Sequence, residues 1–170
     1  MRKTLLATAL LAASLVACKG EAPTTPADQG AVAASSTAQA DAKFAELSQR
    51  WLDGWLALNP VTATQVGDHR FDGEIEDLGA EGRQKPLDFS KKLLAELDAL
   101  DADTLSRENQ VDALILRNQL RGDIWGIETY QGWAWDPQGY GGLAGSAIYN
   151  LMARDFAPMP QRLQSATARM

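Results

Sequence analysis

The sequence predicts an all-α protein, and three observations lead to this prediction. Apolar residues recur at steps of three and four along most of the chain after residue 43, the period of an amphipathic helix. No stretch combines alternating apolar and polar residues with the turn signals of strands. Proline and glycine separate the periodic stretches. We expect about six helices, which form the amino-terminal lobe of a larger helical domain.

The first helix is predicted from residue 43 to residue 58. Its apolar stripe consists of Phe44, Leu47, Trp51, Trp55 and Leu58. Asn59 precedes Pro60 and ends this helix, because the residue before a proline is pushed out of the α region. Pro60 then begins a short helix that ends at Gly67, which suits a left-handed C-cap. Residues 68–83 are rich in glycine and acidic residues and predict a loop.

Two longer helices follow this loop. The apolar face of the third helix consists of Phe89, Leu93, Leu97 and Leu100. The fourth helix begins after Ser106, whose hydroxyl suits an N-cap. It carries one stripe of Val111, Leu114, Ile115 and Trp125 and another of Leu116, Leu120, Ile124 and Ile127. Such a wide apolar arc predicts a helix that is covered on two sides.

A loop and two more helices complete the prediction. Residues 132–145, rich in Gly, Trp and Tyr, predict a loop with a turn at Asp136-Pro137, and a fifth helix is expected over residues 146–155. A sixth helix begins at Pro160, and its expected inner face consists of Leu163, Ala166 and Met170. No C-cap signal follows this helix, so we expect a domain truncated at its carboxyl end. A frayed natural terminus is the alternative.

The amino terminus predicts an exported protein. Arg2 and Lys3 precede an uncharged, mostly apolar run over residues 4–16, which is too short to span a membrane as a mature helix. We therefore assign residues 1–17 as a signal peptide.

The signal peptide ends in Leu15-Val16-Ala17-Cys18, which resembles the lipobox of bacterial lipoproteins. The resemblance implies cleavage before Cys18 and a lipid on its thiol, which would anchor the protein to a membrane. Because Lys19 is not aspartate, the resemblance implies the outer membrane, facing the periplasm, or the cell membrane in a single-membraned host. A plain signal peptide that contains a cysteine is the alternative.

The segment after the cysteine predicts a flexible tether. Residues 19–42 contain mainly Ala, Thr, Ser, Pro, Gln and Gly, which bury too little apolar surface to become ordered. The predicted organisation is therefore a signal peptide at 1–17, a lipidated Cys18 with a disordered tether at 18–42, and a helical domain at 43–170.

Composition limits the chemistry of this chain. Lys and Arg number 16 against 22 Asp and Glu, a net charge of −6, so repulsion from phosphates excludes nucleic acid as a partner. The chain has one Cys and one His, whereas a zinc site needs three or four ligands. We therefore assign no catalytic residue, metal ligand or cofactor within these residues.

Four side chains remain as possible contacts for a substrate or ligand: His69, Trp133, Trp135 and Tyr140. His69 lies between Asp68 and Asp72, which suggests either a metal or acid–base pair or a solvated loop histidine. The three aromatic residues could form a stacking platform for a sugar or a groove for a peptide, or could fix a long loop to the core.

Several segments match the landmarks of a known family in order and spacing. They are Asn59-Pro60, Ala63-Thr64, Gly67, Phe71-Asp72, residues 112–116, Asp136-Pro137 with Tyr140, and Arg154-Asp155-Phe156 with Pro158. Together they resemble the bacterial family called domain of unknown function 885, over about residues 43–170. Members of that family are longer, largely helical and often lipoproteins or exported.

The resemblance also implies a chemistry that these residues do not contain. Family members carry a His-Glu-x-x-Pro-Gly-His motif far downstream, similar to zinc metallopeptidases, whereas the single histidine here is His69. The implied chain is the lipid-anchored amino-terminal part of a zinc-dependent peptidase. The resemblance implies that this part alone has no catalytic activity and that it forms one wall of a peptide cleft. Its implied partner is the missing carboxyl-terminal region of the same protein. The alternative is a complete small periplasmic lipoprotein that binds a ligand or partner through Trp133, Trp135 and Tyr140.

Overall fold

The fold is all-α, as predicted, and residues 26–170 contain no strand. The structure is a computed structural model that describes the chain from residue 26, with side chains from residue 34; the predicted signal peptide and Cys18 lie outside this range. The helices are α1 (Pro26–Leu58), α2 (Pro60–Val66), α3 (Ala80–Asp98), α4 (Arg107–Trp125), α5 (Gly132–Trp135), α6 (Pro137–Met152) and α7 (Met159–Ala168). Short turns η1 (His69–Phe71) and η2 (Ala102–Thr104) and a π-helix η3 (Gly126–Tyr130) connect them.

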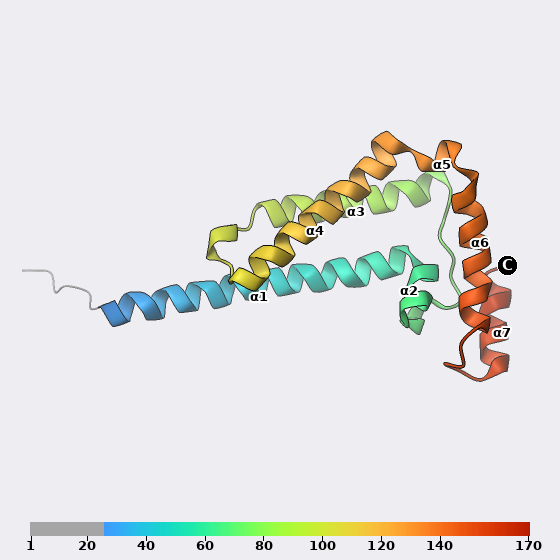
Figure 1. The fold of residues 1–170 in the computed structure, drawn as a ribbon, viewed down its shortest axis with the longest axis horizontal. Helices are drawn as coiled ribbons and strands as arrows, with labels where there is room; N and C mark the ends of the chain where they lie inside the picture. The colour runs from blue at the N-terminus through green and yellow to red at the C-terminus, as the bar shows by residue number, and fades with distance from the viewer. Residues whose placement is uncertain (1–25) are drawn as a thin grey trace, which may run out of the picture.

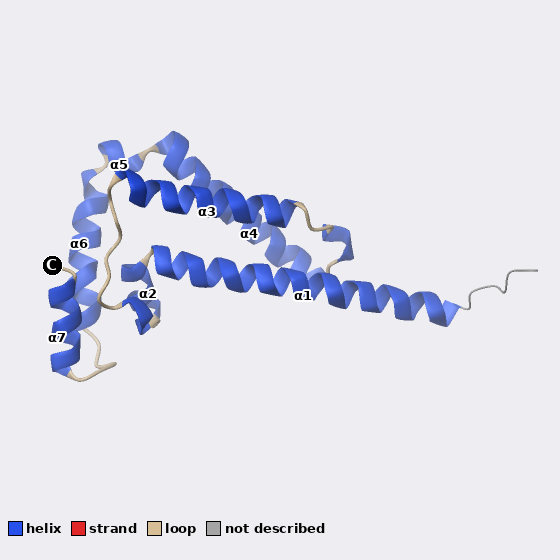
Figure 2. Ribbon diagram, turned by 180° about the vertical axis from the view of Figure 1, so that it is seen from behind, coloured by secondary structure: helices blue, strands red, loops and turns tan. Residues whose placement is uncertain are grey.

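Helices α1, α3 and α4 pack together and contain the main apolar core (Figures 1 and 2). The buried members of this core are Phe44, Leu47, Leu93, Leu97, Leu105, Ala113, Leu116 and Leu120. Removing a leucine side chain from water is worth about 1.5–3 kcal/mol, so these contacts hold the three helices side by side. Several of these residues belong to the apolar stripes predicted from the sequence.

A second group of helices crosses one end of this bundle, where α6 packs against α2 and α7 (Figure 1). The buried guanidinium of Arg169 connects them. Its Nη1 donates to the carbonyl oxygen of Ala147 at 2.9 Å, and its Nη2 donates to Thr64 Oγ1 at 2.7 Å and to the Pro60 carbonyl at 3.2 Å. Burial lowers the pKa of Arg169, while the negative charge of nearby carboxylates opposes this shift.

The inner face of α7 differs from the prediction. Leu163 is half exposed and Met170 is 88% exposed, whereas Arg162 and Arg169 are buried together with Ala166. Arg162 donates to carbonyl oxygens at the end of α6. Two guanidinium groups thus occupy positions on this face because they satisfy backbone oxygens that would otherwise be buried without donors.

The predicted boundaries between the early helices are confirmed. α1 ends at Leu58, Pro60 begins α2, and Gly67 caps α2 with a left-handed φ of 95°. The hydroxyl of Ser106 caps α4 by accepting from the backbone N–H of Asn109.

The predicted tether is wrong for the residues that the structure describes. Residues 26–42 form the amino-terminal half of α1, which projects beyond the other helices (Figure 1). This segment is rich in alanine, the best helix former, and extending an existing helix costs less than nucleating one. No helix of the described residues has the length and apolar character needed to cross a membrane.

The predicted loop over residues 132–145 is also wrong, since α5 and the first half of α6 occupy it. Asp136 is the N-cap of α6 and accepts from the backbone N–H of Gln138 at 3.0 Å, with Pro137 in the first turn. Buried Ala147 and Leu151 fix the helix to the rest of the protein. α6 ends at Met152, earlier than residue 155.

The prediction that α4 is covered on two sides is wrong as well. Leu116 and Leu120 of one stripe are buried, but the stripe that begins at Val111 is exposed. The exposed fractions of this stripe are 41% for Val111, 60% for Leu114, 63% for Ile115 and 54% for Trp125. In the structure of the described residues, one broad apolar face of α4 therefore remains open to solvent.

Replacing Arg169 tests whether its guanidinium connects α2, α6 and α7. We expect Arg169→Ala to lower the free energy of unfolding by about 3 kcal/mol, because Thr64 Oγ1 and buried carbonyls lose their donor. Arg154→Ala is the control, since Arg154 makes an exposed hydrogen bond to the Gln65 carbonyl. The control should change stability by less than about 0.5 kcal/mol. Urea unfolding followed by circular dichroism measures both, and equal effects would contradict the role of Arg169.

Candidate functional site

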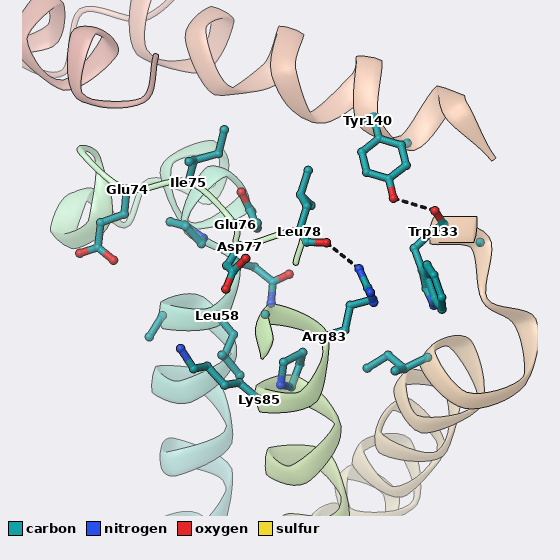
Figure 3. Close-up of a pocket in the computed structure, with 18 of the residues that line it drawn as sticks. Leu58, Glu74, Ile75, Glu76, Asp77, Leu78, Arg83, Lys85, Trp133 and Tyr140 are labelled. Atoms are coloured by element: carbon teal, nitrogen blue, oxygen red, sulfur yellow. Dashed lines mark hydrogen bonds between the residues drawn. The ribbon is translucent and has the colours of Figure 1, made fainter. Parts of the chain in front are cut away.

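A pocket of about 600 Å³ lies where the end of α1, the start of α3 and the first turn of α6 meet (Figure 3). Its apolar lining includes Leu58, Ile75, Leu78, Pro86, Ile127, Trp133 and Tyr140. Its charged lining includes Glu74, Glu76, Asp77, Arg83, Lys85 and Asp136. Apolar surface with a few convergent polar groups is typical of ligand pockets.

The loop before α3 forms one wall of the pocket and is held close to that helix. A Cβ atom on Gly82 would lie 1.8 Å from the Asp77 carbonyl oxygen, so this position requires glycine. The carboxylate of Asp77 accepts from the backbone N–H of Gly79 at 2.8 Å. Both contacts fix the path of residues 77–79, and with it the position of Leu78 in the pocket.

The opposite wall is aromatic and is joined to the loop by an arginine (Figure 3). The guanidinium carbon of Arg83 lies 4.1 Å from the centroid of the Trp133 ring, a cation–π contact. Arg83 also donates to the Leu78 carbonyl at 2.6 Å. The hydroxyl of Tyr140 donates to the Trp133 carbonyl at 2.6 Å. These contacts orient Trp133 and Tyr140 together.

Carboxylates outnumber cations in the lining of the pocket. Glu76 Oε1 accepts from the backbone N–H of Val61 at 3.2 Å. Its second oxygen, Oε2, is buried and has no hydrogen-bond partner among the described residues. Arg83 is already engaged by Leu78 and Trp133, so the pocket offers more acceptors than donors. Such a site suits a ligand that brings N–H groups or positive charge.

The structure separates the three aromatic residues that the sequence analysis grouped. Trp133 and Tyr140 line the pocket, whereas Trp135 does not. Trp135 donates from Nε1 to the Tyr130 carbonyl at 3.0 Å and packs edge-on against the Tyr130 ring, which stacks on Trp125. Trp135 thus belongs to a separate aromatic cluster with Trp125 and Tyr130, and the contact of these tryptophans with a ligand stays a prediction.

His69 also lies away from the pocket. Its Nδ1 is 3.0 Å from Asp72 Oδ2, and its ring stacks on Phe156 with centroids 3.7 Å apart. Neighbouring Asp68 pairs with Arg70, and the hydrogen bonds from Arg70 lower the pKa of Asp68. His69 therefore attaches η1 to the segment after α6.

Zinc does not fit the described residues. They contain no group of three or more His, Cys, Asp or Glu side chains that could hold a metal ion. His69 and Asp72 supply one nitrogen and one carboxylate, short of the three protein ligands of catalytic zinc sites. We therefore derive no metal-assisted step from this chain.

Arg83 and Glu76 are pocket residues that the sequence analysis missed. Arg83 falls in the segment predicted as a loop, and its partner Trp133 is fifty positions away in the chain. Glu76 belongs to an acidic stretch that resembles a solvated surface. No local pattern marks either residue, because their environment arises from packing between distant segments.

Comparisons with known proteins identify the family. The profile of a family described as bacterial protein of unknown function (DUF885) matches residues 60–170. A solved structure described as that of a candidate lipoprotein of unknown function, from Shewanella oneidensis, is similar to this chain, with a TM-score of 0.68 and 32% identity. The match covers 74% of this chain and 23% of that chain. No curated protein matches. This chain belongs to the bacterial family called domain of unknown function 885.

Proposed function

We propose that this protein is an exported lipoprotein, anchored through a lipid on Cys18 to the outer membrane and facing the periplasm. In a single-membraned host, the anchor would lie in the cell membrane. The lipobox-like residues 15–18 and the charged and apolar segments before them support this proposal. The description of the Shewanella oneidensis relative as a candidate lipoprotein supports it further.

Within that protein, the helical lobe supplies a wall that contacts peptide, in a peptidase-like hydrolase whose metal-binding residues lie outside this chain. The pocket between α1, α3 and α6 is the observation that carries this function. Its aromatic and aliphatic lining suits the side chains of a peptide, and the excess of carboxylates over cations in the lining suits peptide N–H or amino groups.

A complete small lipoprotein that binds a ligand is the second candidate, because the same pocket could serve it. The two functions differ in what lies beyond codon 170. A continued reading frame with a His-Glu-x-x-x-x-His helix supports the peptidase-like protein, and a stop codon supports the small binding module.

Metal content and hydrolysis test the first function. The purified 170-residue chain should contain no stoichiometric zinc and should not hydrolyse casein peptides, since its single histidine cannot complete a zinc site. Atomic absorption and mass spectrometry of the peptides measure both. One zinc per chain, or turnover by this chain, would refute the assignment of the reactive centre to another region.

Peptide contact is tested with a matched pair of tryptophans. Trp133→Ala should reduce retention of peptides from a tryptic casein digest by about tenfold or more, since a buried aromatic contact is worth roughly 1–3 kcal/mol. Trp135→Ala removes a tryptophan that is 58% exposed and outside the pocket, and should leave retention unchanged. Equilibrium dialysis with mass spectrometry measures the retained peptides. Equal losses in both variants would argue against this pocket.

Lipid attachment is tested at the cysteine. With the native signal peptide, the chain should incorporate radiolabelled palmitate and fractionate with membranes, whereas Cys18→Ser should do neither, because the acceptor thiol is gone. A labelled serine variant, or an unlabelled native chain, would contradict the lipoprotein assignment.

A further inference from the structure

A second hollow lies on the bundle, between α1 and α4, and the pocket of the proposed function does not include it. We name it the α1–α4 groove; it measures about 520 Å³. The groove is lined by Phe44, Ala45, Ser48, Gln49, Trp51, Leu52, Asp112, Ile115, Leu116 and Gln119. α3 packs against both helices, and two of the lining residues, Phe44 and Leu116, belong to the core that the three helices share.

The groove and its rim leave much apolar surface in water. Ile115 is 63% exposed and Leu52 is 42% exposed in the groove, and Leu114 beside them is 60% exposed. Apolar side chains that are this exposed mark an interaction surface, because they cost free energy while they stay in water.

The charge of the groove limits what can occupy it. Asp112 is the one charged residue of the lining, and the lining has no Lys or Arg. Glu108 lies one turn before Asp112 on α4, so the acidic edge extends along the helix. The lining of a second copy of this chain would add another Asp112 and no Lys or Arg to balance it. The complementary partner is an amphipathic helix with an apolar stripe and a basic flank.

The length of the Shewanella oneidensis relative favours an occupant from outside these 170 residues. The match to this chain accounts for 23% of that protein, so most of the relative lies outside the matched part. We propose that the α1–α4 groove seats an amphipathic helix with basic flanking residues, supplied by a part of a longer protein that lies outside these 170 residues. This inference rests on the proposed function, which also places the reactive centre outside this chain.

A charge placed in the groove tests the contact. In the longer gene product, Ile115→Glu should lower Tm by about 5 °C or more, because the glutamate carboxylate would be buried beside Asp112. In the 170-residue chain the same substitution should shift Tm by less than about 1 °C, since this side chain is exposed there. Val66→Glu is the control: Val66 is 65% exposed and lies outside the groove, so it should have little effect in either protein.

Each of the following outcomes would overturn the inference about the α1–α4 groove. A longer product that tolerates Ile115→Glu as well as Val66→Glu would overturn the inference, while its zinc content and peptidase activity would still support the proposed function. A 170-residue chain that is dimeric by light scattering, and that Ile115→Glu makes monomeric, would also overturn it and assign the groove to a second copy. A stop codon at position 171 would overturn this inference and the peptidase-like function, and would leave the lipid anchor and the small binding lipoprotein as the proposed function.

Discussion

The contact that organises this fold is the buried guanidinium of Arg169. It joins the carbonyl of Ala147 in α6 to Thr64 and the Pro60 carbonyl in α2, so one side chain at the end of α7 fixes α6 to a helix that is far away in the sequence. Only Asn59 separates α2 from α1, and the end of α1 lines one wall of the pocket. α6 contributes Tyr140 to the other wall. The distance between the two walls of the pocket therefore depends on a polar contact outside the main apolar core.

This arrangement separates stability from ligand contact. The core of α1, α3 and α4 is apolar and supplies most of the burial, whereas the pocket lies at its end, where helix termini and a loop converge. Helix ends and loops leave backbone donors and acceptors free, and they tolerate changes in sequence that a core does not. Arg83 is an example of such a residue. It connects the loop before α3 to Trp133 through a hydrogen bond and a cation–π contact, and it lies outside the apolar core.

Local sequence signals are sufficient to predict those helix ends that are set by residues within one turn of the end itself. Asn59-Pro60, Gly67 and Ser106 each act through their own backbone geometry or a hydrogen bond to a near neighbour. Asp136-Pro137 carries a similar helix-start signal, an N-cap residue followed by proline, but the glycines after it favour a loop. That segment is helical because α6 is capped at its start and buried at Ala147, which compensates the low helix propensity of glycine.

Features that depend on distant partners could not be predicted. The periodicity of α7 placed Leu163 and Met170 inside, yet Arg162 and Arg169 are buried because carbonyl oxygens of other helices accept from them. The wide apolar arc of α4 predicts cover on two sides, yet one of its stripes is exposed in the described residues, because periodicity does not say whether another segment covers a face. Pocket residues such as Glu76 had no signature for the same reason.

The helical start of α1 changes what an anchor at the amino terminus would do. A flexible tether lets a domain take any orientation relative to its anchor, whereas a helix is a semi-rigid spacer that fixes the distance between its two ends. α1 has 33 residues and rises by 1.5 Å per residue, so its ends are about 50 Å apart. The pocket is lined by Leu58, the last residue of α1. The pocket thus lies at the carboxyl end of α1, about 50 Å from the residue at which the helix begins, so the helix separates the pocket from whatever holds the amino terminus.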